Sequence, residues 1–120
     1  MRSNFSMWQE HIVTADEYIT MTKGDTLSFG LEVTDQDGDG IDLETAYFTC
    51  KKNLSEIVFQ KSLGDGITQT GDGEYVVRVA PEDTESLLAD RYFYDLQLGV
   101  NGDIFTFKKG VLEIADDATE

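Results

Sequence analysis

The feature that most constrains the fold is the alternation in Leu87–Val100, LLADRYFYDLQLGV. An alternation with a period of two residues places one set of side chains on each face of a β-strand. Burying each large apolar side chain contributes roughly 1.5–3 kcal/mol, so we expect this strand to lie at the centre of the core. Asp95 has the outward parity, where we expect it to meet solvent or a lysine of a neighbouring strand. The inward parity holds Tyr92, Tyr94, Leu96, Leu98 and Val100.

Other alternating segments predict the strands that pair with this one or pack on it. Pro81 suits the first turn of a helix, so one or two helical turns are expected near Pro81–Leu88. Asn101-Gly102 predicts a two-residue hairpin turn, and Gly110 predicts a bulge or kink. Residues 64–73 hold four glycines and predict a loop or a tight hairpin. The predicted strands cover 18–21, 26–33, 46–51, 57–61, 74–79 and 103–109.

This spacing of short strands, with turn signals between them and one short helix, predicts an all-β antiparallel sandwich of about seven strands. An incomplete barrel is the second choice. The 120 residues fit one domain, which we expect to span 17–117, with an acidic tail at 118–120. Cys50 is the only cysteine, which excludes an internal disulfide.

Residues 1–16 do not alternate and are expected to form an N-terminal arm. Phe5, Trp8 and Ile12 are spaced to line one face of a short helix, and the tryptophan would suit docking on a neighbouring subunit. The opposing interpretation is a frayed terminus. This segment also lacks the apolar core of a secretory signal peptide.

The charge of the chain limits its partners. Nine basic residues against 24 acidic residues give a net charge of −15. A field of this sign repels phosphate backbones and anionic lipid surfaces, so we expect neither a nucleic acid nor a membrane as partner. No apolar run approaches the roughly 18 residues of a membrane span.

The sharpest polar motif is the run from Asp35 to Asp42, in which Asp35, Asp37 and Asp39 occupy alternate positions and Gly40 follows the third. Aspartates spaced two residues apart open the calcium loop of an EF-hand. The second half of that loop is missing, because Ala46 stands where a bidentate glutamate is needed. Two interpretations follow: a loose calcium site made by the three aspartates, or a hairpin turn in which aspartate caps its own backbone. The turn is favoured.

The residues do not predict catalysis. His11 lies in the N-terminal arm and has no evident nucleophile as partner, so a serine or cysteine triad is not expected. Cys50 falls on the inward parity of its strand, where a free cysteine is usually a small buried apolar residue. No enzymatic activity and no cofactor are therefore expected.

Several segments in order resemble a known family. They are Lys23-Gly24-Asp25-Thr26, Asp37-Gly38, Ile41-Asp42-Leu43, Pro81-Glu82-Asp83-Thr84, Tyr92-Phe93-Tyr94-Asp95-Leu96 and Gly110-Val111-Leu112-Glu113-Ile114. Together, over about residues 18–117, they resemble the immunoglobulin-like domains of tailed-phage and prophage structural proteins. In particular, they look like the N-terminal domain of baseplate upper-protein-type tail components.

The resemblance implies an immunoglobulin-like sandwich that acts as a virion structural protein, in the tail or baseplate, without catalysis. It implies homo-oligomers, contacts with other virion or tail proteins, and a location in the virion, with the bacterial cytoplasm as the site of assembly. In such sandwiches a corner tyrosine bonds back to the backbone upstream, a role open to Tyr92 or Tyr94. The alternative function is a surface or extracellular immunoglobulin-like binding module, stabilised by calcium.

Overall fold

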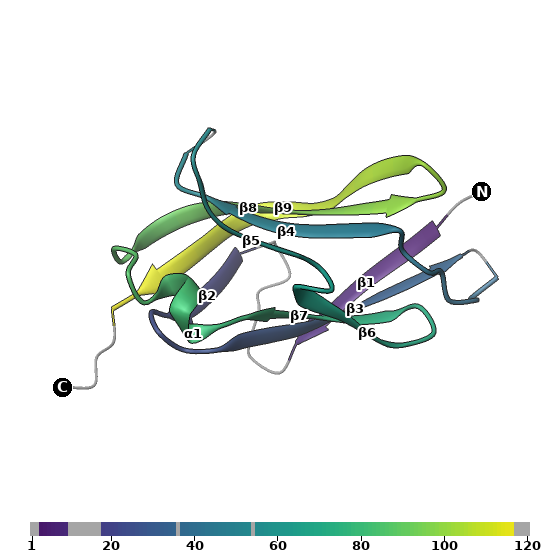
Figure 1. The fold of residues 1–120 in the computed structure, drawn as a ribbon, viewed down its shortest axis with the longest axis horizontal. Helices are drawn as coiled ribbons and strands as arrows, with labels where there is room; N and C mark the ends of the chain where they lie inside the picture. The colour runs from purple at the N-terminus through teal and green to yellow at the C-terminus, as the bar shows by residue number, and fades with distance from the viewer. Residues whose placement is uncertain (1–2, 10–17, 36, 54, 117–120) are drawn as a thin grey trace.

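The computed structural model describes residues 3–9, 18–35, 37–53 and 55–116. They form nine β-strands and one short helix, arranged in two packed layers (Figure 1). The first layer contains, in order, β1 (Ser3–Gln9), β3 (Leu27–Asp35), β7 (Glu74–Val79) and β6 (Gly66–Gly71). The second contains β5 (Ile57–Leu63), β4 (Thr45–Lys51), β8 (Asp90–Val100), β9 (Asp103–Ala115) and β2 (Tyr18–Thr22).

The layers are continuous at one corner, where the chain passes from β5 to β6. Ser62 pairs with Gly66 and Leu63 pairs with Ile67 across this corner. Gly64 and Gly66 have φ angles of 91° and 99°, which glycine adopts at little cost. Most strand pairs are antiparallel, whereas β2 runs parallel to β9 and the short β5–β6 pairing is also parallel. This is the all-β sandwich expected from the sequence, with more strands than the seven predicted.

β8 lies at the centre of the second layer, between β4 and β9. All five side chains predicted to point inward are buried, with exposed fractions of 0–9%. The Asn101-Gly102 hairpin is also confirmed: both residues have positive φ angles, 53° and 85°, as a type I′ turn requires. The strand with the strongest alternation is therefore the one that the second sheet is built on.

An aromatic cluster joins the two layers through the middle of the core. The Phe48 ring of β4 lies 5.4 Å from the Phe29 ring of β3, edge to face, and 5.4 Å from the Tyr94 ring of β8. Phe59 of β5 completes the cluster at 6.3 Å from Phe48. Aromatic pairs at such distances contribute about 0.5–1.5 kcal/mol beyond the burial of their surface.

The corner before β8 is closed by a tyrosine. The Tyr92 hydroxyl donates a hydrogen bond of 2.7 Å to the Leu88 carbonyl, four residues upstream. This is the bond that defines a tyrosine corner in immunoglobulin-like sandwiches, so Tyr92 holds the corner role rather than Tyr94.

The helix α1 (Pro81–Thr84) is tied to the sandwich by polar contacts. Asp83 accepts a hydrogen bond from the Ala80 amide at 2.7 Å and lies 2.6 Å from the Lys61 ammonium of β5. The buried Thr84 hydroxyl accepts a hydrogen bond from the Gly24 amide, in the turn after β2. Proline starts this helix, as predicted, and the Lys61 side chain and the Gly24 backbone amide hold it from two other segments.

Two expectations were wrong, and one was confirmed in part. Residues 3–9 form β1, not a helix, because they add to the edge of β3 with Phe5 opposite Val33. Residues 64–73, expected to form a loop or a tight hairpin, contain strand β6 and the turn of its hairpin with β7, in which Ile67 lies opposite Val77. The bulge in β9 lies between the partners of Leu96 and Gln97, while Gly110 pairs regularly with Tyr94.

We expect Tyr92→Phe to lower the free energy of unfolding by about 1–1.5 kcal/mol, because the Leu88 carbonyl loses its partner at the corner. Urea unfolding followed by tryptophan fluorescence or circular dichroism measures this change. Tyr47→Phe is the matched control, because Tyr47 is 36% exposed and its hydroxyl is not part of the corner. Equal unfolding midpoints for the two variants would contradict the assignment.

We also expect stability to fall at alkaline pH. Burial raises the pKa of the Cys50 thiol from 9.0 to about 12, and burial also raises the pKa of Tyr75 and Tyr92. Because these folded values exceed the unfolded ones, the unfolded chain releases its protons first as the pH rises. The contribution of these three groups to the free energy of unfolding is fully present below about pH 8, and it is lost as the pH rises from about 9 towards 12. Urea midpoints at pH 7, 9, 10 and 11 test this, and Cys50→Ala should decline less steeply. Equal midpoints at pH 7 and 11 would contradict it.

Candidate functional site

The aspartates predicted as a calcium site lie in the loop between β3 and β4. One Asp35 carboxylate oxygen accepts hydrogen bonds from the Asp37 amide at 2.9 Å and the Asp39 amide at 3.0 Å. The Gly38 amide donates to the Asp35 carbonyl, and Gly38 has a φ angle of 85°. Asp35 thus caps the backbone of its own loop, the arrangement of an Asx turn.

The same loop brings the three carboxylates together. One oxygen from each of Asp35, Asp37 and Asp39 lies within 4.8 Å of the others, and the loop is open to solvent. Calcium takes six to eight oxygen ligands, so three carboxylates would supply part of a coordination shell and water would supply the rest. The geometry allows a loose calcium site, which remains a prediction.

Below the aspartates the loop is fixed to the sandwich by Tyr75 of β7. Its hydroxyl accepts a hydrogen bond of 2.7 Å from the Leu43 amide and lies 3.5 Å from the Ile41 carbonyl, to which it donates. Gly40 sits against the turn between β6 and β7, where a β-carbon would come within 2.6 Å of the Asp72 backbone. Tyr75 is thus a second buried tyrosine, after Tyr92, whose hydroxyl bonds to the backbone. The sequence did not reveal this role, because Tyr75 has the same inward parity as Val77 and Val79 and therefore looks like an ordinary core residue.

A different surface, the outer face of β4, β8 and β9, carries exposed apolar side chains. We call it the β4–β8–β9 face. Phe93 is 49% exposed, Ile104 63% and Tyr47 36%. The outward positions of β3 and β7 in the other layer include Glu32, Glu74 and Arg78, which are all exposed. One face of the sandwich is therefore partly apolar, whereas the described outward positions of the other include several charges.

A groove of about 440 Å³ opens on the β4–β8–β9 face. Strand register explains its lining, because Lys51, Phe93 and Val111 are paired in one row across the three strands. Asp95 pairs with Lys109 in the next row. The groove thus has an apolar floor with charges beside it. Its lining includes Lys51, Asn53, Phe93, Asp95, Lys109 and Val111.

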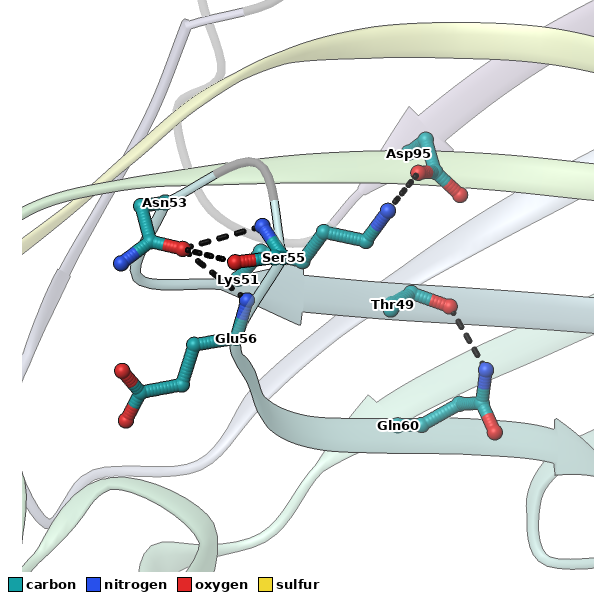
Figure 2. A network of polar contacts seen from close by, with 7 residues as sticks. All are labelled: Thr49, Lys51, Asn53, Ser55, Glu56, Gln60 and Asp95. Atoms are coloured by element: carbon teal, nitrogen blue, oxygen red, sulfur yellow. Dashed lines mark hydrogen bonds and ion pairs between the residues drawn. The ribbon is translucent and has the colours of Figure 1, made fainter.

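Polar contacts hold the side chains around the groove in place. The Lys51 ammonium lies 3.8 Å from the Asp95 carboxylate, which confirms that Asp95 meets a lysine of a neighbouring strand (Figure 2). Gln60 of β5 donates a hydrogen bond of 2.8 Å to the Thr49 hydroxyl. Side chains beside the groove are therefore held in position by contacts within the chain.

The turn between β4 and β5 forms one wall of the groove and is organised by Asn53. Its side-chain oxygen accepts hydrogen bonds from the Ser55 amide at 2.9 Å, the Ser55 hydroxyl at 3.1 Å and the Glu56 amide at 3.0 Å (Figure 2). The Lys52 amide also donates to the Glu56 carbonyl at 2.8 Å. Asn53 thus fixes the turn between β4 and β5.

The residues considered for catalysis are placed as follows. Cys50 is fully buried and its thiol has a pKa of about 12, so it is neutral at physiological pH and unsuited to nucleophilic attack. His11 lies outside the described residues. No helix among the described segments is long and apolar enough to cross a membrane.

The fold matches solved structures of β-sandwich domains. CopC from Methylosinus trichosporium OB3b aligns with a TM-score of 0.50 and 12% identity, over 89% of this chain and 90% of that one. The filamin domain of Lin-41 aligns with a TM-score of 0.50 and 12% identity, over 92% and 90%. No protein-family model and no curated protein sequence matches the chain. The strand order, the tyrosine corner and these matches define an immunoglobulin-like β-sandwich module.

We expect Asp35→Ala to lower the free energy of unfolding by about 1–2 kcal/mol, with or without calcium, because two loop amides lose their acceptor. Asp37→Ala and Asp39→Ala should have small effects in calcium-free buffer. Thermal melts with EDTA and with millimolar calcium measure the stability of each variant and its dependence on calcium. A calcium-dependent rise of several degrees that Asp37→Ala and Asp39→Ala abolish would instead establish the metal site.

Proposed function

We propose that the chain is a non-enzymatic structural protein of a phage or prophage virion, a tail or baseplate assembly module that acts through protein–protein contacts. The observation that carries the proposal is the β4–β8–β9 face, with its exposed aromatic and aliphatic side chains around a groove. An apolar patch with polar residues around it is the usual form of a protein-binding surface.

The chemistry of the face favours a protein over other partners. Phe93 and Tyr47 are large, rigid side chains that bury much surface at low entropic cost. Nucleic acid would require a basic surface, whereas the chain has a net charge of −15. The same charge disfavours anionic membranes.

The assignment to a virion is supported by the resemblance over residues 18–117. Its motifs fall at structural positions: Pro81 starts α1, Tyr92 closes the corner and Gly110 lies in β9 opposite β8. A module of this kind would be assembled in the bacterial cytoplasm and would remain in the virion.

One observation favours a second candidate, a surface or extracellular binding module stabilised by calcium. The carboxylates of Asp35, Asp37 and Asp39 lie within 4.8 Å of one another in an open loop. Extracellular calcium reaches the millimolar concentrations that weak sites of few ligands require. This candidate would bind its partner through the same β4–β8–β9 face, but at the cell surface or outside the cell rather than in a virion.

Purification of phage particles from the host, after prophage induction, tests the location. We expect mass spectrometry of the particles to contain peptides of this chain in stoichiometric amounts with known tail proteins, and antibody labelling to mark the tail. Detection on the surface of uninduced cells by protease accessibility, together with absence from the particles, would contradict the proposal and support the second candidate.

A further inference from the structure

The charges of the β4–β8–β9 face differ from those of the rest of the molecule. Its outward positions include Lys51, Arg91 and Lys109 as cations, with Asp95 and Glu113 as anions. Among the described side chains, these outward positions therefore carry three cations and two anions. This part of the surface is nearly neutral, whereas the other described acidic residues lie at other positions of the fold.

This distribution limits what binds the face. A basic partner would be attracted to the acidic remainder of the surface rather than to this face, and an acidic partner would gain little from a nearly neutral one. A surface that carries apolar groups with cations and anions in adjacent positions is complementary to a copy of itself turned by a two-fold axis.

We propose that the partner on this face is a second copy of the same chain, packed face to face in a two-fold dimer. This inference rests on the proposed function of the module in protein contacts. Phe93 of each copy would enter the groove of the other, between Lys51 and Lys109. Lys109, which is exposed, would meet the Asp95 carboxylate across the axis, since Asp95 contacts Lys51 only at 3.8 Å.

The size of the face agrees with a dimer. The three strands of the face, which are 7, 11 and 13 residues long, rise roughly 3.3 Å per residue and lie about 4.8 Å apart, so they present a projected area on the order of 500 Å². Side-chain relief makes the accessible area larger, close to the roughly 800 Å² per partner of a stable interface. The β-sheet also holds the contacting side chains in fixed positions, which lowers the entropic cost of association.

Light scattering coupled to size exclusion, and sedimentation velocity over a concentration series, test the dimer on the full chain. We expect a monomer–dimer equilibrium that Phe93→Asp weakens by at least about 30-fold, the effect of removing an interface hot spot. Leu88→Asp is the matched control, because Leu88 is 76% exposed outside this face. Circular dichroism and thermal melts show whether each variant is folded.

A charge exchange tests the orientation. Asp95→Lys and Lys109→Asp should each weaken the dimer, and the double variant should restore it to within a few-fold, because the pair is reversed but kept. Raising the salt concentration should strengthen the wild-type dimer, because it screens repulsion between two chains of charge −15.

A monomer at all concentrations, or a dimer unchanged by Phe93→Asp, would overturn the inference. A monomer that retains a small molecule in the groove by native mass spectrometry would overturn it in favour of a ligand site. A monomer found in phage particles would overturn the dimer but leave the virion proposal intact. A protein that forms the dimer in solution but is absent from the particles would overturn the virion proposal and leave the dimer inference intact.

Discussion

The packing of Phe48 between Phe29 and Tyr94 is the contact on which the rest of the structure depends. Phe29 belongs to the first layer, and the other two rings belong to the second. In immunoglobulin domains a disulfide between the layers and a tryptophan on the third strand occupy this region, and the second cysteine stands two residues after the corner tyrosine. Here Tyr94 stands two residues after Tyr92, and the only cysteine, Cys50, is free. Aromatic contacts thus take the place of the covalent link.

Polar contacts at the ends of the sandwich complement this core. Tyr92 fixes the corner before β8, Tyr75 fixes the loop that leads into β4, and Asp83 joins α1 to Lys61. These side chains are largely buried, and each satisfies a backbone group or a charge that would otherwise be costly to bury. The strands that carry the β4–β8–β9 face are consequently held from both ends.

Much of the core could be predicted from the sequence, because the parity of a strand depends only on local order. The inward residues of β8, β3 and β7 follow directly from alternation. The corner role stayed open between Tyr92 and Tyr94 until the hydrogen bond of Tyr92 to the Leu88 carbonyl decided it. β1 and β6 were missed because their strand conformation depends on pairing with β3 and β7. The bulge in β9 was misplaced because it depends on the register with β8 rather than on Gly110.

The sequence by itself determined an all-β sandwich, its central strand, its charge and the Asp35–Asp39 turn, because these depend on neighbours along the chain. The tertiary structure alone decided the groove. Lys51, Phe93 and Val111 come from three strands, and only their register places them in one row. An outward phenylalanine in isolation says little, since apolar atoms make up much of any protein surface. Its meaning comes from the neighbours that hydrogen bonding between distant segments brings beside it.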